Sequence, residues 1–281
     1  MLGYFAASLM GSSHQFEENG VCQDAHSVKL LNSGWIVAAI ADGLGSSKHS
    51  DVASSVAVNA ATEYLSSNAP VEWNNEEIKA LLRKAFDSSL TAVTQEAGDN
   101  SLKEYETTLT LLMYDGQNVA YGSVGDGGII ALTSDGDYLL LNTPMKGEVF
   151  NETIPLHYGS SFWEIGHTDK TICSLLMLTD GIFDVAYPWL LSKQKQKIYV
   201  NYVRPFMDRN ILPVNNHDDF RQVEQESIDY FKQVEEITDD KTFVGIINTD
   251  FLPSLKEKSY YDEPDWVKLH DEAVNHSEPV E

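Results

Sequence analysis

Three apolar segments, each followed closely by an aspartate beside a glycine, constrain this chain more than any other feature. They occupy residues 35–41, 118–124 and 172–179. The aspartates that follow them are Asp42, Asp126 and Asp180. Uncharged runs of this length, bounded by turn residues, are typical of strands that are buried on both faces. The sequence therefore predicts buried strands that deliver carboxylates to their own ends.

Carboxylates at the rim of a buried strand are costly unless a positive charge meets them. Taken alone, Asp42 with Gly43 also fits an ordinary Asp-Gly turn. Three such aspartates, however, would repel one another unless cations lie between them. Ligands that offer only oxygen favour hard cations, so the pattern predicts Mg²⁺ or Mn²⁺. Gly43 and Gly45 would let the backbone come close to a bound group.

The composition narrows the class of protein. The chain has 281 residues, with 19 Lys+Arg and 43 Asp+Glu, so its formal charge is −24. This length suits one large α/β domain or two small ones, and so acidic a surface argues against nucleic acid and anionic membranes as partners. Cys22 and Cys173 lie in apolar segments, which predicts reduced core residues and a cytoplasmic protein. No segment has the character of a membrane span.

The pattern of apolar residues predicts most helices and strands. Ser50 is expected to cap a first helix and Asn74 or Asn75 to begin a second, with a further helix around Phe220–Val234. The predicted strands are Tyr4–Met10, Ser27–Leu31, Trp35–Ala41, Thr107–Tyr114, Asn118–Val124, Ile129–Thr133, Tyr138–Leu141, Ile172–Thr179 and Thr242–Asn248. Short links join the four strands between residues 107 and 141, so these are expected to be antiparallel neighbours.

The remaining segments lack a clear period. Residues 142–170 are expected to form a loop or flap, and residues 185–216 are ambiguous. From about residue 251 the chain is polar and acidic, which predicts a partly disordered tail. We therefore expect one domain over residues 1–250 and an acidic C-terminal tail over residues 251–281.

Six short motifs occur in order along residues 1–248. They are Gln23-Asp24-Ala25-His26, Asp42-Gly43, Thr107-Thr108-Leu109, Gly125-Asp126, Asp180-Gly181-Ile182-Phe183-Asp184 and Asp239-Asp240-Lys241-Thr242. In this order the chain resembles the metal-dependent Ser/Thr phosphatases of the protein phosphatase 2C type, in a bacterial-like branch. The resemblance implies an α+β fold, a four-layer α-β-β-α sandwich of two antiparallel sheets flanked by helices.

The resemblance also implies a binuclear metal centre of two Mg²⁺ or Mn²⁺ ions, with a third ion as a further option. Asp42 would bridge the first two ions, and the Gly43 carbonyl would bind the second. Asp180 and Asp239 would hold the first ion. Two divalent cations neutralise a phosphate monoester and activate a water that attacks phosphorus. Asp42, Asp180 and Asp239 are therefore the predicted catalytic carboxylates.

Other residues receive lesser roles from the same resemblance. Asp24 would accept hydrogen bonds from metal-bound waters, and Asp126 and Asp184 match positions that hold a third, weaker ion in bacterial members. Asp184 could instead cap the following helix. Asp240 is interpreted as a residue that shapes the turn. Thr107-Thr108 are expected to begin a core strand, with hydroxyl or backbone contacts near the site as the alternative.

The chain departs from the family pattern at several positions. Gln23 and Leu44 stand where eukaryotic members often carry Glu and His, and no Arg precedes Arg83 to bind phosphate. His14 is the nearest candidate for a phosphate-binding or proton-donating group, and Lys48 is the next. An exposed loop histidine is an equally open interpretation of His14.

These observations predict a hydrolase of phosphoserine or phosphothreonine in proteins, acting in signalling with a phosphorylated protein as substrate and a Ser/Thr kinase as partner. The expected state is a cytoplasmic monomer that binds neither nucleic acid nor membranes. Two alternatives stay open: a catalytically weak pseudophosphatase that binds a phosphoprotein or regulates a kinase, and an enzyme for another phosphate substrate such as a nucleotide. The presence of Asp42, Asp180 and Asp239 favours the enzyme, because a binding module has no need for three mutually repelling carboxylates.

Overall fold

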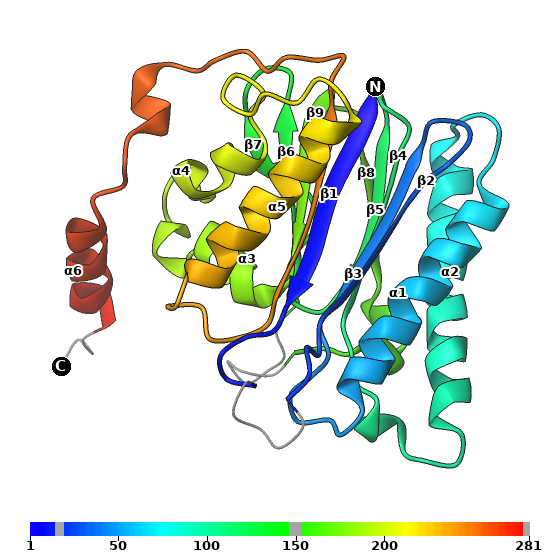
Figure 1. The fold of residues 1–281 in the computed structure, drawn as a ribbon. Coiled ribbons are helices and arrows are strands. Elements are labelled where there is room, and N and C mark those ends of the chain that lie inside the picture. Colours follow the sequence, from blue (N-terminus) through cyan, green and yellow to red (C-terminus); the bar gives the residue numbers. More distant parts are fainter. Residues whose placement is uncertain (15–19, 146–152, 278–281) are drawn as a thin grey trace.

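Two antiparallel sheets packed face to face form the centre of the molecule (Figure 1). The computed structural model describes residues 1–14, 20–145 and 153–277. In spatial order the first sheet contains β1 (Leu2–Leu9), β10 (Lys241–Asn248), β9 (Ile172–Leu178), β6 (Gly128–Thr133) and β7 (Tyr138–Leu140). The second contains β2 (Ala25–Leu30), β3 (Ile36–Ala41), β4 (Leu109–Tyr114), β5 (Val119–Val124) and β8 (Glu164–Thr168). Neighbouring strands are antiparallel throughout both sheets.

Helices cover the outer face of each sheet. The second sheet is covered by α1 (Ser50–Asn68) and α2 (Asn75–Ala97). The first is covered by α3 (Asp180–Ala186), α4 (Val200–Val203) and α5 (His217–Gln233). Farther out on that side lies α6 (Trp266–Ser277), shown in red in Figure 1. The predicted α+β fold and its α-β-β-α layers are thereby confirmed.

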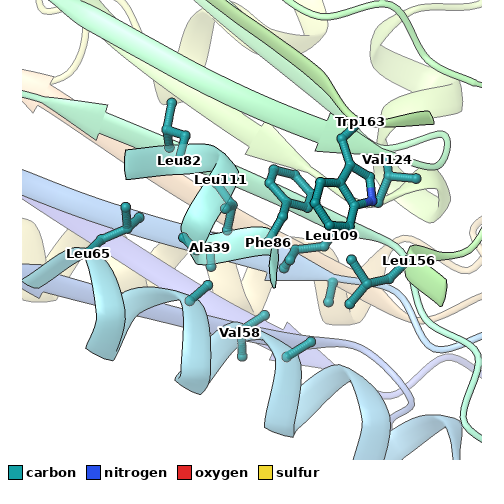
Figure 2. Packing of buried hydrophobic residues seen from close by; sticks show 14 of the residues in the cluster. Ala39, Val58, Leu65, Leu82, Phe86, Leu109, Leu111, Val124, Leu156 and Trp163 are labelled. Carbon is teal, nitrogen blue, oxygen red and sulfur yellow. The ribbon is translucent and has the colours of Figure 1, made fainter. Parts of the chain in front are cut away.

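Three apolar layers account for this arrangement. One lies between the sheets, where side chains such as Ile40, Leu112 and Val244 pack together. The other two lie between each sheet and its helices. In the layer under α2, the rings of Phe86 and Trp163 stack with centroids 5.1 Å apart (Figure 2). Every residue of β3, β4, β5 and β9 is buried, as expected of strands covered on both faces.

The helix starts show how local sequence directs these elements. The Asn74 side chain accepts hydrogen bonds from the backbone N–H groups of Glu76 and Glu77, so the predicted start of α2 is confirmed. Ser50 was expected to cap α1 but is its first residue, and His49 occupies the cap position without a side-chain bond. This prediction was wrong by one residue, which is the usual uncertainty of a helix boundary.

The strand pairing differs from the prediction at one link. The short link 125–127 was expected to join antiparallel neighbours, but β5 belongs to the second sheet and β6 to the first. The chain therefore crosses between the sheets here, and β5 pairs instead with β8. Loop length alone cannot distinguish a hairpin from a crossing, because in a sandwich the two sheets also lie close together.

The segment 142–170 was predicted to be a loop or flap. Its described parts contain β8 and two short 3₁₀ turns at Leu156–Tyr158 and Ser160–Phe162, while residues 146–152 lie outside the described part. The strand was missed because its residues Glu164–Thr168 alternate only weakly and are half-buried.

The predicted tail, residues 251–281, also carries structure. It contains a 3₁₀ turn at Lys258–Tyr261 and helix α6, and residues 278–281 lie outside the described part. The predicted boundary near residue 250 stays a prediction. Within the described ranges, none of the helices combines the length and the apolar character needed to cross a bilayer.

Candidate functional site

Three aspartates meet where strands from both sheets end. Asp42 follows β3 of the second sheet, and Asp180 follows β9 of the first and begins α3. Asp126 lies in the link that crosses from β5 to β6. Each of the three offers one carboxylate oxygen, and these oxygens lie within 4.8 Å of one another. The structure thus gathers the three aspartates that the apolar segments singled out.

Asp42 is held through its backbone by two threonines. Its N–H donates to the Thr108 hydroxyl (2.8 Å), and its carbonyl accepts from the Thr108 N–H (2.8 Å) and the Thr107 hydroxyl (2.9 Å). Both threonines are buried, and β4 begins only at Leu109. The strand thus begins two residues later than predicted, although Thr107 pairs with Gly43 in an isolated antiparallel bridge. The alternative, hydroxyl contacts near the site, is also observed.

Gly43 is required by the packing of the chain itself. A Cβ atom at this position would lie 2.6 Å from the carbonyl oxygens of both Gln23 and Ser50. The Gly43 N–H also donates to the Gln23 carbonyl (3.2 Å). Gly43 was predicted to let the backbone come close to a bound group, but the neighbouring backbone already explains a glycine here.

Asp126 depends on the geometry of the crossing link. Gly125 has φ +101°, a conformation that favours glycine, and it turns the chain into Asp126. The Thr153 hydroxyl donates to Oδ2 of Asp126 (2.8 Å). Thr153 belongs to the segment that was predicted as a loop or flap, and nothing in its local sequence marks it as a contact of the site.

Asp24 lies beside this cluster and is almost fully buried, with 6% of its surface exposed. The Thr179 hydroxyl, from the residue before Asp180, donates to Oδ2 of Asp24 (2.7 Å). Thr179 was missed as a site residue, although its place between an apolar strand and Asp180 could have indicated it. The contact joins the start of β2 to the end of β9.

Asp239 and Asp184 lie nearby but outside the set of three. The Asp239 Cβ is 3.4 Å from the place that a Cβ on Gly181 would take, so it lies at the start of α3. Its Oδ1 accepts from the Asp240 N–H (2.8 Å). Asp184 is exposed and lies within α3, one turn after Asp180, so it does not cap that helix as the alternative suggested.

The pKa values of the clustered carboxyls are raised. Burial, followed by the charges of Asp42, Asp126 and other aspartates, raises the pKa of Asp180 to about 9. Burial also raises the pKa values of Asp24 and Asp42, and neighbouring carboxylates raise them further. Carboxyl groups that resist ionisation this strongly require either protons or cations.

His14 makes its contact elsewhere. Its Nδ1 lies 3.1 Å from Oδ1 of Asp240, and 13% of the side-chain surface is exposed. The structure thus pairs His14 with Asp240, so the interpretation as an exposed loop histidine is wrong. Lys48 is exposed, and the Leu44 N–H donates to the Glu106 carbonyl (3.1 Å).

The comparisons with known proteins agree with this geometry. The sequence profile of protein phosphatase 2C matches residues 10–225. The chain belongs to the protein phosphatase 2C family. No curated protein sequence matches it. The family assignment therefore rests on the profile match, which spans most of the chain.

Solved structures of bacterial members share the protein phosphatase 2C fold. A bacterial serine phosphatase is 16% identical with a TM-score of 0.59, covering 91% of this chain and 100% of its own. The phosphatase Stp1 from Staphylococcus aureus is 16% identical with a TM-score of 0.56, covering 88% and 95%. The catalytic domain of PstP, solved with two manganese ions, is 16% identical with a TM-score of 0.57, covering 88% and 97%.

The donor set of this chain fits a hard divalent cation. Three carboxylate oxygens converge within 4.8 Å, and further carboxyls of Asp24 and Asp239 lie beside them. All are oxygen ligands, which Mg²⁺ and Mn²⁺ prefer. The charges that raise the pKa of Asp180 belong to other aspartates, so a cation would relieve the repulsion among them.

Proposed function

We propose that this protein is a Mg²⁺- or Mn²⁺-dependent phosphatase that hydrolyses phosphoserine or phosphothreonine in proteins. The single observation that carries the proposal is the convergence of Asp42, Asp126 and Asp180 within 4.8 Å in a chain of the protein phosphatase 2C family. Three carboxylates at such close range cost free energy, and binding of cations explains why the fold gathers them.

The proposed ligands follow the positions of the motifs. Asp42 would serve both cations, the Gly43 carbonyl would serve the second, and Asp180 and Asp239 would hold the first. Asp24 would accept hydrogen bonds from waters bound to these cations. Bound cations neutralise the phosphate dianion and supply a water nucleophile at neutral pH.

Asp126 and Asp184 are the proposed carboxylates for a third, weaker ion. Asp126 lies within 4.8 Å of Asp42 and Asp180, whereas Asp184 is exposed one turn farther along α3. Because Asp126 lies so close to Asp42 and Asp180, it is also a candidate ligand of the first two ions.

The hydrogen bonds of the chain orient these carboxylates. Thr107 and Thr108 fix the backbone of Asp42, and Thr179 fixes one oxygen of Asp24. Such partners hold acidic side chains in place against their mutual repulsion, and losing one typically costs tenfold to a hundredfold in affinity or activity. The proposed substrate is a phosphorylated protein, and the proposed source of its phosphate is a Ser/Thr kinase.

A pseudophosphatase is the second candidate. Its support is the sequence of this chain: Gln23 and Leu44 replace Glu and His of eukaryotic members, and no Arg precedes Arg83. His14, the proposed substitute, contacts Asp240. On this alternative the protein binds a phosphoprotein or regulates a kinase without turning over phosphate.

Hydrolysis of an aryl phosphate and of a phosphoserine peptide, each with and without Mn²⁺, tests the proposal. We expect turnover of both only with Mn²⁺. The variant Asp42→Ala should lose activity by about a hundredfold or more, since it removes a ligand rather than a supporting contact. Asp99 is exposed and lies two residues after the end of α2, so Asp99→Ala is the matched control and should retain full activity.

Thermal unfolding with increasing Mn²⁺ shows whether the protein binds the metal, which both the phosphatase and the pseudophosphatase are proposed to do. Mn²⁺ at a hundredfold excess over its dissociation constant should stabilise the folded protein by about 3 kcal/mol. Binding without turnover would favour the pseudophosphatase. An unmoved melting curve in the unmutated protein would contradict the metal centre itself.

A further inference from the structure

The buried carboxylate of Asp240 ties together two places on the segment between β1 and β2. Its Oδ1 accepts from the Gly11 N–H (2.7 Å), and its Oδ2 accepts from the Gln23 N–H (2.5 Å). The His14 Nδ1 lies 3.1 Å from the same Oδ1. Asp240 itself is only 3% exposed. Both oxygens are therefore engaged by residues more than 200 positions away in the chain.

The contact continues from Gln23 into the candidate metal centre. The Gln23 carbonyl accepts from the Gly43 N–H (3.2 Å) and the Ser54 hydroxyl (2.5 Å). The residue after Gln23 is Asp24, whose carboxylate is bonded to Thr179. Both polar backbone groups of Gln23 are thus hydrogen-bonded. Its N–H donates to Asp240, and its carbonyl accepts from Gly43 and Ser54.

A residue that only shaped its own turn would have different partners. The neighbouring Asp239 shows such a local contact, since its Oδ1 accepts from the adjacent Asp240 N–H. Asp240 instead brings a negative charge into a buried place near other carboxylates, which is costly. Two charge-assisted bonds from backbone N–H groups offset that cost, because they are stronger than neutral hydrogen bonds. An asparagine would offer one acceptor oxygen and leave one of the two N–H groups unpaired.

The geometry points to Asp240 as a positioning residue of the candidate metal centre: its carboxylate clamps Gly11 and Gln23 and thereby sets the places of Asp24 and Gly43. The clamp itself is a property of the chain, and its effect on metal binding rests on the proposed function. His14 belongs to the clamp as a third, weaker arm.

Amide hydrogen exchange in the metal-free protein tests the clamp directly. With Asp240→Asn we expect the N–H groups of Gly11, Gln23 and Gly43 to exchange about tenfold to a hundredfold faster. Gly11 and Gln23 bond to the charged carboxylate directly, and the bond of Gly43 depends on the position of Gln23. Amides in the middle of β4 should keep their rates and show that the variant is folded. Unchanged rates at Gly11 and Gln23 would overturn the clamp.

Asp208→Asn is the matched control. Asp208 is also buried (2% exposed), and it accepts from the Arg204 Nε (2.7 Å) and the Asn210 N–H (2.9 Å). This variant should raise exchange at Asn210 and leave Gln23 and Gly43 unchanged. If Asp240→Asn does not fold, Asp240→Glu replaces it, with faster exchange at Gln23 expected and unchanged rates counting against the clamp.

Calorimetric Mn²⁺ titration tests the link to the metal centre. Asp240→Asn should weaken affinity about tenfold or more, as loss of a supporting contact does. In an Asp24→Asn background the same change should cost less than about threefold, because residues that act through one another are not additive. Full additivity would overturn the role of Asp240 in placing Asp24.

His14→Ala separates the arms of the clamp. It should change Mn²⁺ affinity less than about threefold, since both backbone bonds to Asp240 remain. An effect as large as that of Asp240→Asn would assign the clamp to the His14 pair and overturn the proposal as stated. If the unmutated protein binds no Mn²⁺, the proposed function fails, while the exchange rates still decide the clamp.

Discussion

At the scale of single residues, the protein concentrates its unfavourable charge in one place. Asp24, Asp42 and Asp180 all have raised pKa values, with burial as the largest cause. The Thr108 hydroxyl bonds to the backbone of Asp42, and the Thr179 hydroxyl bonds to the carboxylate of Asp24. These hydrogen bonds thus hold the aspartates together against a repulsion that only protons or cations remove.

This repulsion predicts how stability depends on pH when a chelator keeps the protein free of metal. The pKa of Asp180 rises from 3.8 to about 9 in the folded state, so that state binds the proton more tightly than the unfolded chain. The free energy of unfolding should therefore fall as pH rises between about 4 and 9. One such group contributes a slope of at most about 1.4 kcal/mol per pH unit.

Urea unfolding of the unmutated protein and Asp180→Asn from pH 5 to pH 8 checks this sign. The variant lacks the titrating group, so it should be relatively more stable at pH 8 and decline less steeply. Excess Mn²⁺ should reduce the decline in the unmutated protein. Parallel curves for the two proteins in the chelator would show that Asp180 does not carry the effect.

At the scale of elements, the candidate site is positioned by the ends of strands from both sheets. β3 and β9 come from different sheets, and the link from β5 to β6 crosses between them. The helices α1 and α2 pack on the second sheet through an apolar layer in which Phe86 is fully buried (Figure 2). Gly122 of β5 leaves the space that the Phe86 ring occupies, since a Cβ there would lie 2.5 Å from it.

Phe86→Ala should therefore lower the free energy of unfolding by about 3–5 kcal/mol, through lost apolar contact and a cavity beside Trp163. Urea denaturation measures this change. Val71→Ala is the matched control, because Val71 is 94% exposed and its truncation should stay within about 0.5 kcal/mol. A loss below about 1 kcal/mol for Phe86→Ala would show that the layer under α2 collapses around the gap.

At the scale of the whole molecule, the C-terminal segment packs against one edge of the first sheet. β7 is that edge, and the Tyr138 N–H donates to the Tyr260 hydroxyl (3.1 Å). The Arg204 guanidinium lies 4.0 Å from the centre of the Tyr261 ring, and Lys256 pairs with Asp137 (2.8 Å). A partner on an edge strand occupies backbone groups that would otherwise invite other chains.

Deleting residues 252–281 tests the predicted domain boundary. The shortened protein should fold and keep Mn²⁺-dependent activity, because all the proposed ligands lie before residue 250. The melting temperature should fall by several degrees, since about 1–3 kcal/mol of contacts is lost and each kcal/mol corresponds to about 2–4 °C at this size. A shortened protein that cannot fold would place the boundary beyond residue 250.

The sequence by itself determined the elements whose signals are local. Apolar runs identified β3 and β9, and Asn74 marked the start of α2, because burial pattern and capping depend on residues within a few positions. The three apolar segments that each end beside an aspartate also pointed to Asp42, Asp126 and Asp180 as a group, and the fold brings one carboxylate oxygen of each within 4.8 Å of the others. The ligand roles assigned to them stay predictions.

Only the tertiary structure decided which distant groups meet. The crossing at Gly125 could not be distinguished from a hairpin by its length, and the weakly alternating β8 showed no clear period. The hydrogen bond from Thr153 to Asp126, and those to Asp240 from Gly11 and Gln23, join residues that lie far apart in the sequence. Such contacts depend on how the whole chain packs, because no local preference selects a partner more than 200 residues away.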